Sequence, residues 1–322
     1  MTATAVPEPI AVASVVDQSF LPMVRVVASS IAAAASSGRP VNYHVIYHGR
    51  DSRMSRQMAG WQSGPVRVHM HRLPNPWERF GRIGGFPPSS LSRLSLPEML
   101  PGLSRLIYLD VDVVVQADLG ELFDTPLLGQ PLGAVRDRVV AELALRTDGD
   151  NADQPSMLSY LREIVGLNSR ETILDYRQAG VLLMDLNRLR ALDFTASARK
   201  VVERHGTALR YADQCVINIV LRDRMAVLDP RWNVITGSIT PSSTARALPE
   251  FVHHSHLQAT APRILHYAGN KPWNRLGLPL GRRWWRQAVA SGLGPYFAMR
   301  HLSERGRLET ASLVKRIWRR RP

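Results

Sequence analysis

Short apolar runs alternate with helix-like segments over the N-terminal third of the chain. Runs typical of buried strands cover residues 10–16, 43–47, 66–70 and 105–115. Between them, residues 21–37, 52–61 and 89–99 carry helix patterns, and Gly38 is a natural stop for the first helix. This alternation predicts an α/β fold with a doubly wound, largely parallel sheet. Ligands of such sheets bind beyond the carboxyl ends of the strands.

The remainder of the chain is less regular. We expect strands at residues 132–135, 180–184 and 263–267, a helix capped by Asp185 that continues to about Arg204, and another helix at residues 213–221. Residues 138–166 are polar and contain an acidic run at 148–153, which predicts a loop or a lid. That run lacks the twelfth-position Glu of a calcium-binding loop. We expect a catalytic domain at residues 1–276 and a basic, Trp- and Arg-rich helical tail at residues 277–322.

The net charge of +14 is concentrated near the C-terminus. Residues 275–322 contain 12 Lys or Arg and 2 Asp or Glu, which leaves +4 for the preceding 274 residues. Tryptophan lies among these arginines in two places, at residues 282–286 and 315–321. Trp beside Arg is typical of a membrane interface, so we expect the tail to contact an anionic membrane surface. A solvated helix with a tryptophan packed on the body is the alternative, and nucleic acid is not expected as a partner.

The single cysteine, Cys215, excludes a disulfide framework and a cysteine-based zinc site, and a core position suits it best. No apolar run approaches the roughly 20 residues of a membrane span. The first basic residue is Arg25, so we expect no secretory signal. The expectation is a cytoplasmic protein, peripheral on the inner face of the plasma membrane where the tail binds lipid.

Two carboxylates follow the apolar part of the fourth run. Asp110 and Asp112 are separated by one residue, so on a strand both would point to the same face. Two like charges on a buried face repel each other and lose hydration, and a divalent cation relieves both costs. Oxygen ligands favour Mg²⁺ or Mn²⁺. The motif alone leaves three interpretations open: a sugar-nucleotide transferase, a phosphatase with an Asp nucleophile, or two surface aspartates.

His266, Gly269 and Lys271 follow the last expected strand. An imidazole can complete a coordination sphere begun by two carboxylates, and its nitrogen favours Mn²⁺ over Mg²⁺. Lys271 is one of three lysines in the chain and suits phosphate oxygens. His266 alone would be interpreted as a core histidine, but its neighbours favour a metal ligand beside a diphosphate. The phosphatase interpretation is weakened because no further acidic pair follows Lys271.

With these motifs the chain resembles glycosyltransferase family 8, retaining enzymes that include bacterial lipopolysaccharide galactosyl- and glucosyltransferases and glycogenin. The resemblance rests on Arg93, on residues 106–112 (LIYLDVD), 179–186 (AGVLLMDL) and 211–214 (YADQ), and on residues 266–273 (HYAGNKPW). It covers roughly residues 10–275. It implies a GT-A fold, with a mixed doubly wound sheet and helices on both faces, and a UDP-sugar donor.

The resemblance also implies roles for individual residues. The metal, Mn²⁺ with Mg²⁺ as the alternative ion, would be bound by Asp110, Asp112 and His266. The phosphates would be held by Gly269 and Lys271, and the uracil would be approached by Asp17. The donor sugar would be contacted by Arg93, Asp137, Gln178, Ala179, Gly180 and Asp213. The catalytic residues would be Asp213 and Gln214, with Gln214 near the anomeric carbon.

Three positions depart from the family pattern. Gln178 stands where the family has Asn, Val16 replaces a second acidic residue before Asp17, and the spacing from His266 to Lys271 is one residue shorter than usual. The implied reaction is an Mn²⁺-dependent transfer of glucose or galactose from a UDP-sugar to a glycan or lipid-linked acceptor, with retention. A non-catalytic, membrane-associated protein of the same fold is the alternative, followed by a metal-dependent phosphatase.

Overall fold

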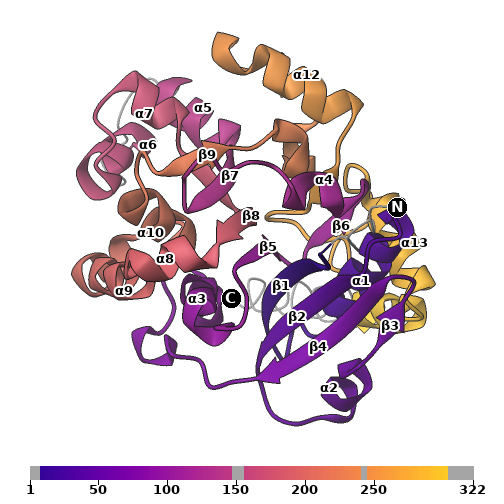
Figure 1. Ribbon diagram of the computed structural model, residues 1–322. Helices are drawn as coiled ribbons and strands as arrows, with labels where there is room; N and C mark the ends of the chain where they lie inside the picture. The colour runs from indigo at the N-terminus through magenta and orange to yellow at the C-terminus, as the bar shows by residue number, and fades with distance from the viewer. Residues whose placement is uncertain (1–7, 147–155, 241–244, 304–322) are drawn as a thin grey trace, which may run out of the picture.

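The computed structural model describes residues 8–146, 156–240 and 245–303. A mixed sheet forms its centre, with strand order β3-β4-β2-β1-β5-β8-β7-β9 (Figure 1). The strands are β1 (Ile10–Asp17), β2 (Val41–His48), β3 (Gln62–Ser63), β4 (Val66–Arg72), β5 (Arg105–Leu109), β7 (Leu132–Arg136), β8 (Arg177–Asp185) and β9 (Met225–Val227). The neighbours β4, β2, β1 and β5 run parallel, whereas β8 is antiparallel to both β5 and β7. The expected α/β class and the mixed sheet are confirmed.

Helices cover the sheet on both sides (Figure 1). They are α1 (Met23–Ala34), α2 (Arg53–Met58), α3 (Leu96–Met99), α4 (Leu119–Phe123), α5 (Arg138–Arg146), α6 (Met157–Tyr160), α7 (Arg170–Leu174), α8 (Leu186–Ala191), α9 (Phe194–His205), α10 (Ala212–Val220), α12 (Val252–Thr260) and α13 (Gly281–Ala290). Among the shorter turns of helix, η2 (Pro88–Ser95) and η5 (Pro230–Trp232) are 3₁₀ and η3 (Leu161–Val165) is a π-helix.

The run expected as one strand at residues 105–115 is in fact two strands in different sheets. β5 ends at Leu109, and β6 (Val113–Val115) joins a second sheet of order β10-β11-β6 with β10 (Val234–Ile235) and β11 (Ile264–His266). The residues Asp110, Val111 and Asp112 form the turn between the sheets. The prediction that both carboxylates lie on one strand face was therefore wrong. The turn itself directs them into the same space.

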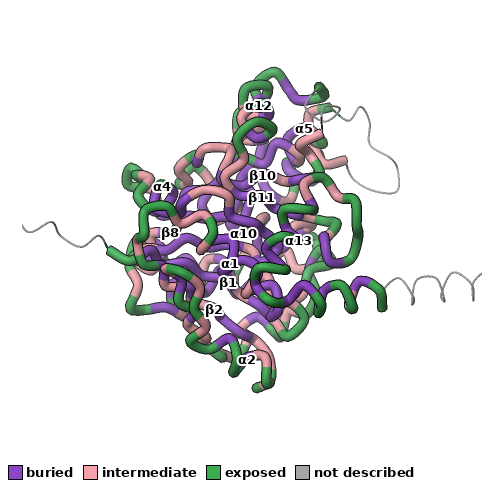
Figure 2. The backbone as a smooth tube through the Cα atoms, turned by 90° about the vertical axis from the view of Figure 1, so that its right-hand side faces the viewer, coloured by how far each residue is buried: buried purple, intermediate pink, exposed green. Residues whose placement is uncertain are grey.

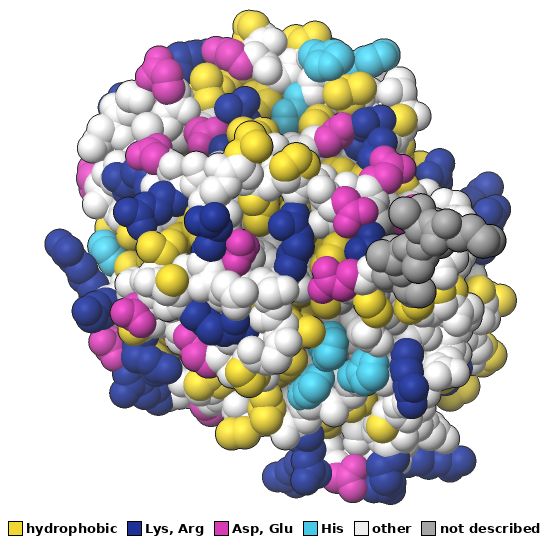
Figure 3. All heavy atoms as spheres, viewed as in Figure 1, with side chains coloured by type: hydrophobic (Ala, Val, Ile, Leu, Met, Phe, Trp, Pro, Cys, Tyr) yellow, Lys and Arg dark blue, Asp and Glu magenta, His cyan; other side chains and the backbone are white. Residues whose placement is uncertain are grey.

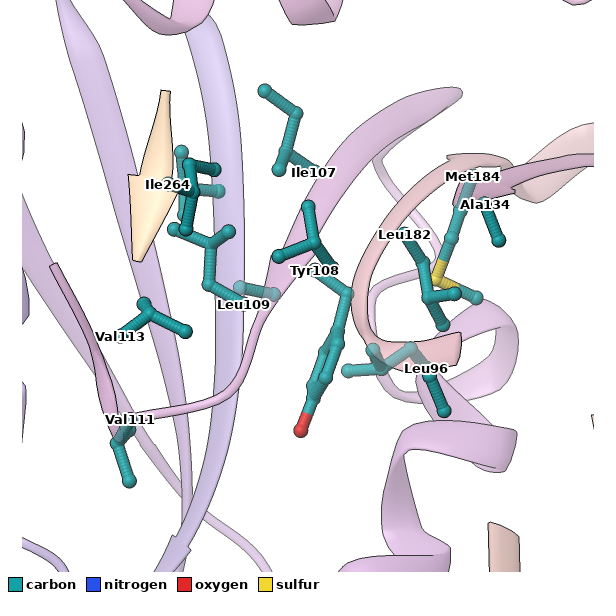
Figure 4. Packing of buried hydrophobic residues seen from close by; sticks show 14 of the residues in the cluster. Leu96, Ile107, Tyr108, Leu109, Val111, Val113, Ala134, Leu182, Met184 and Ile264 are labelled. Atoms are coloured by element: carbon teal, nitrogen blue, oxygen red, sulfur yellow. The ribbon is translucent and has the colours of Figure 1, made fainter. Parts of the chain in front are cut away.

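Apolar packing fixes the strand that leads into this turn. Figure 4 shows Ile107 and Leu109 on the side of Ile264, whereas Tyr108 lies on the side of Leu96 and Leu182. All of these side chains are buried. Because β5 is packed on both faces, its carboxyl end has a defined position, and so does the acidic turn that follows.

Three further expectations need correction. The helix predicted to continue from Asp185 to Arg204 is broken between α8 and α9 at Asp193, whose φ of 48° lies in the left-handed region that Asp tolerates. The predicted cap is present, since Asp185 Oδ1 accepts a hydrogen bond from Arg188 N at 2.9 Å. Residues 138–166 contain α5, α6 and η3 rather than only a loop, and the acidic run 148–153 lies outside the described residues. The helical segment 89–99 is mostly 3₁₀.

The helix α13 packs on the body of the protein against α1. Trp284 is fully buried, with its ring centroid 5.2 Å from that of Trp273 and 4.8 Å from that of Phe297. This agrees with the alternative in which a tryptophan of this region packs on the body. The second basic segment, residues 315–321, lies outside the described residues. Within the described ranges, no helix combines the length and apolar character needed to cross a bilayer.

Replacing Trp284 should test how firmly α13 belongs to the folded body. We expect Trp284→Ala to lower the free energy of unfolding by about 3–5 kcal/mol, because a large buried ring is lost from an aromatic cluster. Trp285→Ala, at a half-buried neighbour, should cost clearly less. Urea denaturation of the two variants measures the difference, and equal small losses would show that α13 contributes little to the fold.

Candidate metal and donor site

A cavity of about 530 Å³ opens at the carboxyl ends of β1 and β5. It is lined by every residue to which the sequence assigns a role: Asp17, Arg93, Asp110, Asp112, Asp137, Gln178, Ala179, Gly180, Asp213, Gln214, His266, Gly269 and Lys271. These residues come from positions up to 254 apart in the chain. The fold therefore gathers the whole predicted set into one place, at the edge of the sheet where ligands of such folds bind.

Asp110, Asp112 and His266 form a compact group of potential metal ligands. His266 Nε2 lies 3.3 Å from Asp112 Oδ1 and 3.8 Å from Asp110 Oδ2. One donor atom from each residue falls within 4.8 Å of the other two. Two carboxylates and one imidazole suit a divalent ion such as Mn²⁺.

Asn233 orients the imidazole of His266. The Nδ1 of His266 lies 2.9 Å from Asn233 Oδ1, and Asn233 is fully buried immediately before β10. With Nδ1–H donating to Asn233, the Nε2 lone pair points at the two carboxylates. A lone pair facing two anions is unfavourable unless a cation lies among them, so this donor set fits a metal ion. Asn233 was not predicted as a functional residue, because it lies in a segment without a recognisable motif.

Gly180 makes room for the same ring. A Cβ at this position would lie 2.7 Å from His266 Nδ1 and 3.0 Å from Asp110 Oδ2. The Gly180 carbonyl also accepts a hydrogen bond from Asp110 N at 2.8 Å. Glycine is needed here because of close approach, since Gly180 is not among the glycines with positive φ.

Arg93 forms ion pairs with two carboxylates of the cavity, Asp110 and Asp213. Its guanidinium donates to Asp110 Oδ1 at 2.8 Å, to Asp213 Oδ2 at 3.1 Å and to the Ala179 carbonyl at 2.7 Å. Burial lowers the pKa of Arg93, but Asp110 and Asp213 together raise it above its usual value, so the group stays cationic. The resemblance implied that Arg93 holds the donor sugar; its observed contacts are with the protein, where it neutralises two carboxylates.

Lys271 forms an ion pair with Asp112, the second carboxylate of the acidic turn. Its Nζ donates to the Asp112 carboxylate and, at 3.1 Å, to the Tyr267 carbonyl. Burial raises the pKa of Asp112, but the cationic Lys271 outweighs burial and holds that pKa well below its usual range. Asp112 is therefore ionised at neutral pH.

Gln214, Asp137 and Gln178 form a polar wall on another side of the cavity. Gln214 Oε1 accepts from Ala179 N at 3.2 Å, and its Nε2 donates to Asp137 Oδ2 at 3.0 Å. Burial raises the pKa of Asp137, and its hydrogen bonds from the Val140 backbone and the glutamines oppose this only in part. Gln178 is buried, and among the described residues its Oε1 has no hydrogen-bond partner. Gln178 Oε1 is thus a buried acceptor left for a ligand.

Asp213 and Asp17, two further carboxylates of the cavity, have different surroundings. Burial raises the pKa of Asp213 to about 6, while Arg93 opposes the rise and Asp110 adds to it. Asp17 is the last residue of β1 and shapes the turn after it, because its Oδ1 accepts from Ser19 N at 2.8 Å and its Oδ2 from Ser89 Oγ at 3.4 Å. Its carboxylate therefore lies at the cavity rim with both oxygens partly used by the protein.

A family model described as "Glycosyl transferase family 8" matches residues 11–277, close to the predicted range of resemblance. The chain belongs to glycosyltransferase family 8. Among curated relatives, glycosyltransferase 8 domain-containing protein 1 of Xenopus tropicalis is 30% identical over 200 residues, 58% of this chain and 51% of that protein. Probable galacturonosyltransferase 7 of Arabidopsis thaliana is 27% identical over 208 residues, 62% of this chain and 29% of that protein. The family 8 chain spans about half the length, or less, of these relatives.

Solved structures agree on the fold of this family 8 protein. The WbbM bifunctional glycosyltransferase superposes with a TM-score of 0.75 at 21% identity, covering 93% of this chain and 53% of that one. The galactosyltransferase LgtC in complex with donor and acceptor sugar analogs superposes with a TM-score of 0.70 at 22% identity, covering 88% and 95%. At this identity the likeness establishes a shared GT-A architecture.

Gly180→Ala tests the close approach of His266. The added methyl group should push the imidazole away from the carboxylates and weaken Mn²⁺ binding roughly tenfold or more, measured by calorimetry. Gly237→Ala is the matched control, because a Cβ there meets nothing within 4 Å and its φ is not positive. Unchanged Mn²⁺ affinity in Gly180→Ala would contradict the geometry.

Asn233→Ala tests the orientation of His266. Without the buried acceptor the ring loses its preferred tautomer, so Mn²⁺ affinity should fall about 10- to 100-fold. Asn233→Asp should retain most of the affinity, since a carboxylate also accepts from Nδ1–H. Calorimetry measures binding and thermal unfolding checks folding; equal loss in both variants would indicate a structural role only.

Proposed function

We propose that this chain is a retaining glycosyltransferase that moves a hexose, glucose or galactose, from a UDP-sugar to a glycan or lipid-linked acceptor. The observation that carries the proposal is the convergence of Asp110, Asp112 and His266 in a cavity of family 8 architecture. The complex of LgtC with donor and acceptor sugar analogs supports a reaction between two sugar ligands. The Arabidopsis relative carries the name of a galacturonosyltransferase, so the choice of hexose is itself part of the proposal.

Asp110, Asp112 and His266 would hold the divalent cation, Mn²⁺ with Mg²⁺ as the alternative. When bound, this ion supplies positive charge that stabilises the departing nucleoside diphosphate. Lys271 is partly exposed to the cavity beside Asp112, where a cationic amine would add to that stabilisation. Gly269, with a φ of 82°, allows the backbone of the same segment to turn toward the phosphates.

The polar wall suits the sugar. Gln178 Oε1, which has no partner among the described residues, would accept a hydrogen bond from a sugar hydroxyl. The Asp137 carboxyl group, which already accepts from Gln214 Nε2, would be a second acceptor, and Ala179 and Gly180 give the sugar ring space. Together these groups would fix the sugar with its anomeric carbon near Gln214.

Gln214 is a poor nucleophile, because an amide oxygen is weakly basic and here already accepts from Ala179 N. Retention would therefore proceed by attack from the face of the leaving group rather than through a covalent intermediate. Gln214 and Asp213 would stabilise the positive charge of an oxocarbenium-like transition state. Arg93 would hold Asp213 in place for this role.

The proposal extends to the acceptor and to contact with a membrane. The positive charge of residues 275–322 favours an anionic membrane surface, where lipid-linked acceptors would be found. This would make residues 277–322 a membrane-contact region attached to the catalytic residues 1–276.

Asp112→Asn tests the function directly. The amide keeps the shape of the side chain and removes the charge, so Mn²⁺ affinity and Mn²⁺-dependent hydrolysis of UDP-glucose or UDP-galactose should fall at least about 100-fold. Asp223→Asn is the control, because Asp223 is exposed and does not line the cavity; this variant should behave as the wild type.

Two outcomes would count against the proposal. Equal turnover in Asp112→Asn and the wild type would remove the metal assignment. A wild-type chain that binds UDP-sugars with Mn²⁺ but neither hydrolyses nor transfers them would favour the non-catalytic alternative.

A further inference from the structure

A second cavity, of about 680 Å³, lies in the turns that lead into α13. Its wall combines guanidinium groups with apolar side chains: Arg275, Arg282, Arg283, Leu276, Leu278, Leu280 and Trp285. It shares no lining residue with the donor cavity. We call it the arginine cavity.

Within the described part of the chain, no acidic side chain neutralises the positive charge of the arginine cavity. Among the described residues, no carboxylate lies within ion-pair distance of Arg275, Arg282 or Arg283, and the one side-chain partner is Gln116, whose Oε1 accepts from Arg283 Nη1 at 2.7 Å. Many other arginines are paired, such as Arg170 with Glu250 at 2.6 Å. The N-terminal end of the α13 dipole adds positive potential here, and the first turn of the helix contains no acidic residue that would offset it. Such a cavity favours a phosphate group.

The surface around the arginine cavity is apolar as well as basic. Leu276 is 55% exposed in its wall, and Val289 is 66% exposed on α13. Figure 2 shows α13 at the molecular surface with exposed segments before and after it.

This combination distinguishes a lipid phosphate from a soluble one. At a bilayer, arginines meet the headgroup phosphates while apolar side chains enter the acyl boundary. A soluble phosphate would leave the exposed leucine and valine in water, with no gain from their burial. By contrast, the face of the protein in Figure 3 interleaves basic side chains with acidic ones.

The arginine cavity is firmly attached to the donor site. Tyr267 Oη donates to the Leu280 carbonyl at 2.8 Å, and buried Trp284 holds α13 to the core. The backbone N–H groups of Asn274 and Arg275 both donate to the Lys271 carbonyl, at 3.0 and 2.9 Å. A bilayer bound here would therefore have a defined orientation relative to the donor cavity.

We propose that the arginine cavity binds the phosphate of an anionic lipid headgroup and seats this face of the protein on a bilayer. The inference deepens the membrane contact proposed above by assigning it to a defined site among the described residues. It requires neither nucleotide nor metal, so it can fail or succeed independently of the transferase chemistry.

Vesicle partitioning of the full chain tests the proposal. Vesicles of phosphatidylcholine with phosphatidylglycerol should bind the wild type at physiological salt, and pure phosphatidylcholine vesicles should bind it much less. The triple variant Arg275→Gln, Arg282→Gln, Arg283→Gln should lose roughly 100-fold in partition coefficient, as expected for three basic residues at an anionic surface.

A second triple variant, Arg162→Gln, Arg204→Gln, Arg224→Gln, is the matched control. It removes the same charge at exposed arginines of η3, α9 and the turn after α10. Because α9 and α10 lie on the opposite side of Figure 1 from α13, and charges beyond a Debye length are screened, this variant should change partitioning about threefold or less. Thermal unfolding and UDP binding with Mn²⁺ should be unchanged in both variants.

Two results would overturn the lipid assignment. Equal weakening of vesicle binding by both triple variants would reduce it to an effect of net charge. Unchanged vesicle binding in the cavity variant, together with lost stabilisation by inorganic phosphate in thermal unfolding, would assign the cavity to a soluble phosphate. Vesicle binding without any UDP-sugar binding would instead contradict the proposed function alone.

Discussion

Two carboxylates of like charge lie side by side in the turn between two sheets, and the surrounding structure is arranged to tolerate them. Arg93 donates to Asp110 and Lys271 donates to Asp112, so each anion has its own cation. His266 directs a ring nitrogen at both. Repulsion in a partly buried site would otherwise drive the carboxylates apart or protonate one of them. Their retention as a charged pair is what makes this cavity suited to a divalent ion.

The supporting residues follow from that constraint. Gly180 has no side chain because the imidazole of His266 occupies the space where a Cβ would be. Asn233 is buried because the other nitrogen of the ring needs an acceptor. Arg93 also binds Asp213, which precedes Gln214 in the chain, so the acidic turn is coupled to the polar wall that contains Gln214. A single substitution in this network should therefore shift the positions of several potential metal-ligand atoms.

The sequence predicted much of the fold and the membership of the cavity, for identifiable reasons. Apolar runs bounded by turn residues located β1, β2, β4 and β8. The family motifs located most of the cavity residues that were assigned a role, whereas Asp17, Asp137 and Gln178 lie outside those motifs and were assigned from the resemblance as a whole. The division of residues 105–115 was missed because Val113–Val115 is as apolar as Arg105–Leu109, and periodicity does not report a change of sheet. The break at Asp193 was missed because the flanking pattern continues through it. Asn233 could not be found, since its role depends on the pairing of β10 with β11.

The most direct test of the central claim is the position of the metal itself. Crystals grown with Mn²⁺ and UDP should give an anomalous difference peak at about 2.0–2.3 Å from His266 Nε2 and from a carboxylate oxygen of both Asp110 and Asp112. A peak that lies elsewhere in the cavity, out of reach of the imidazole, would contradict the account.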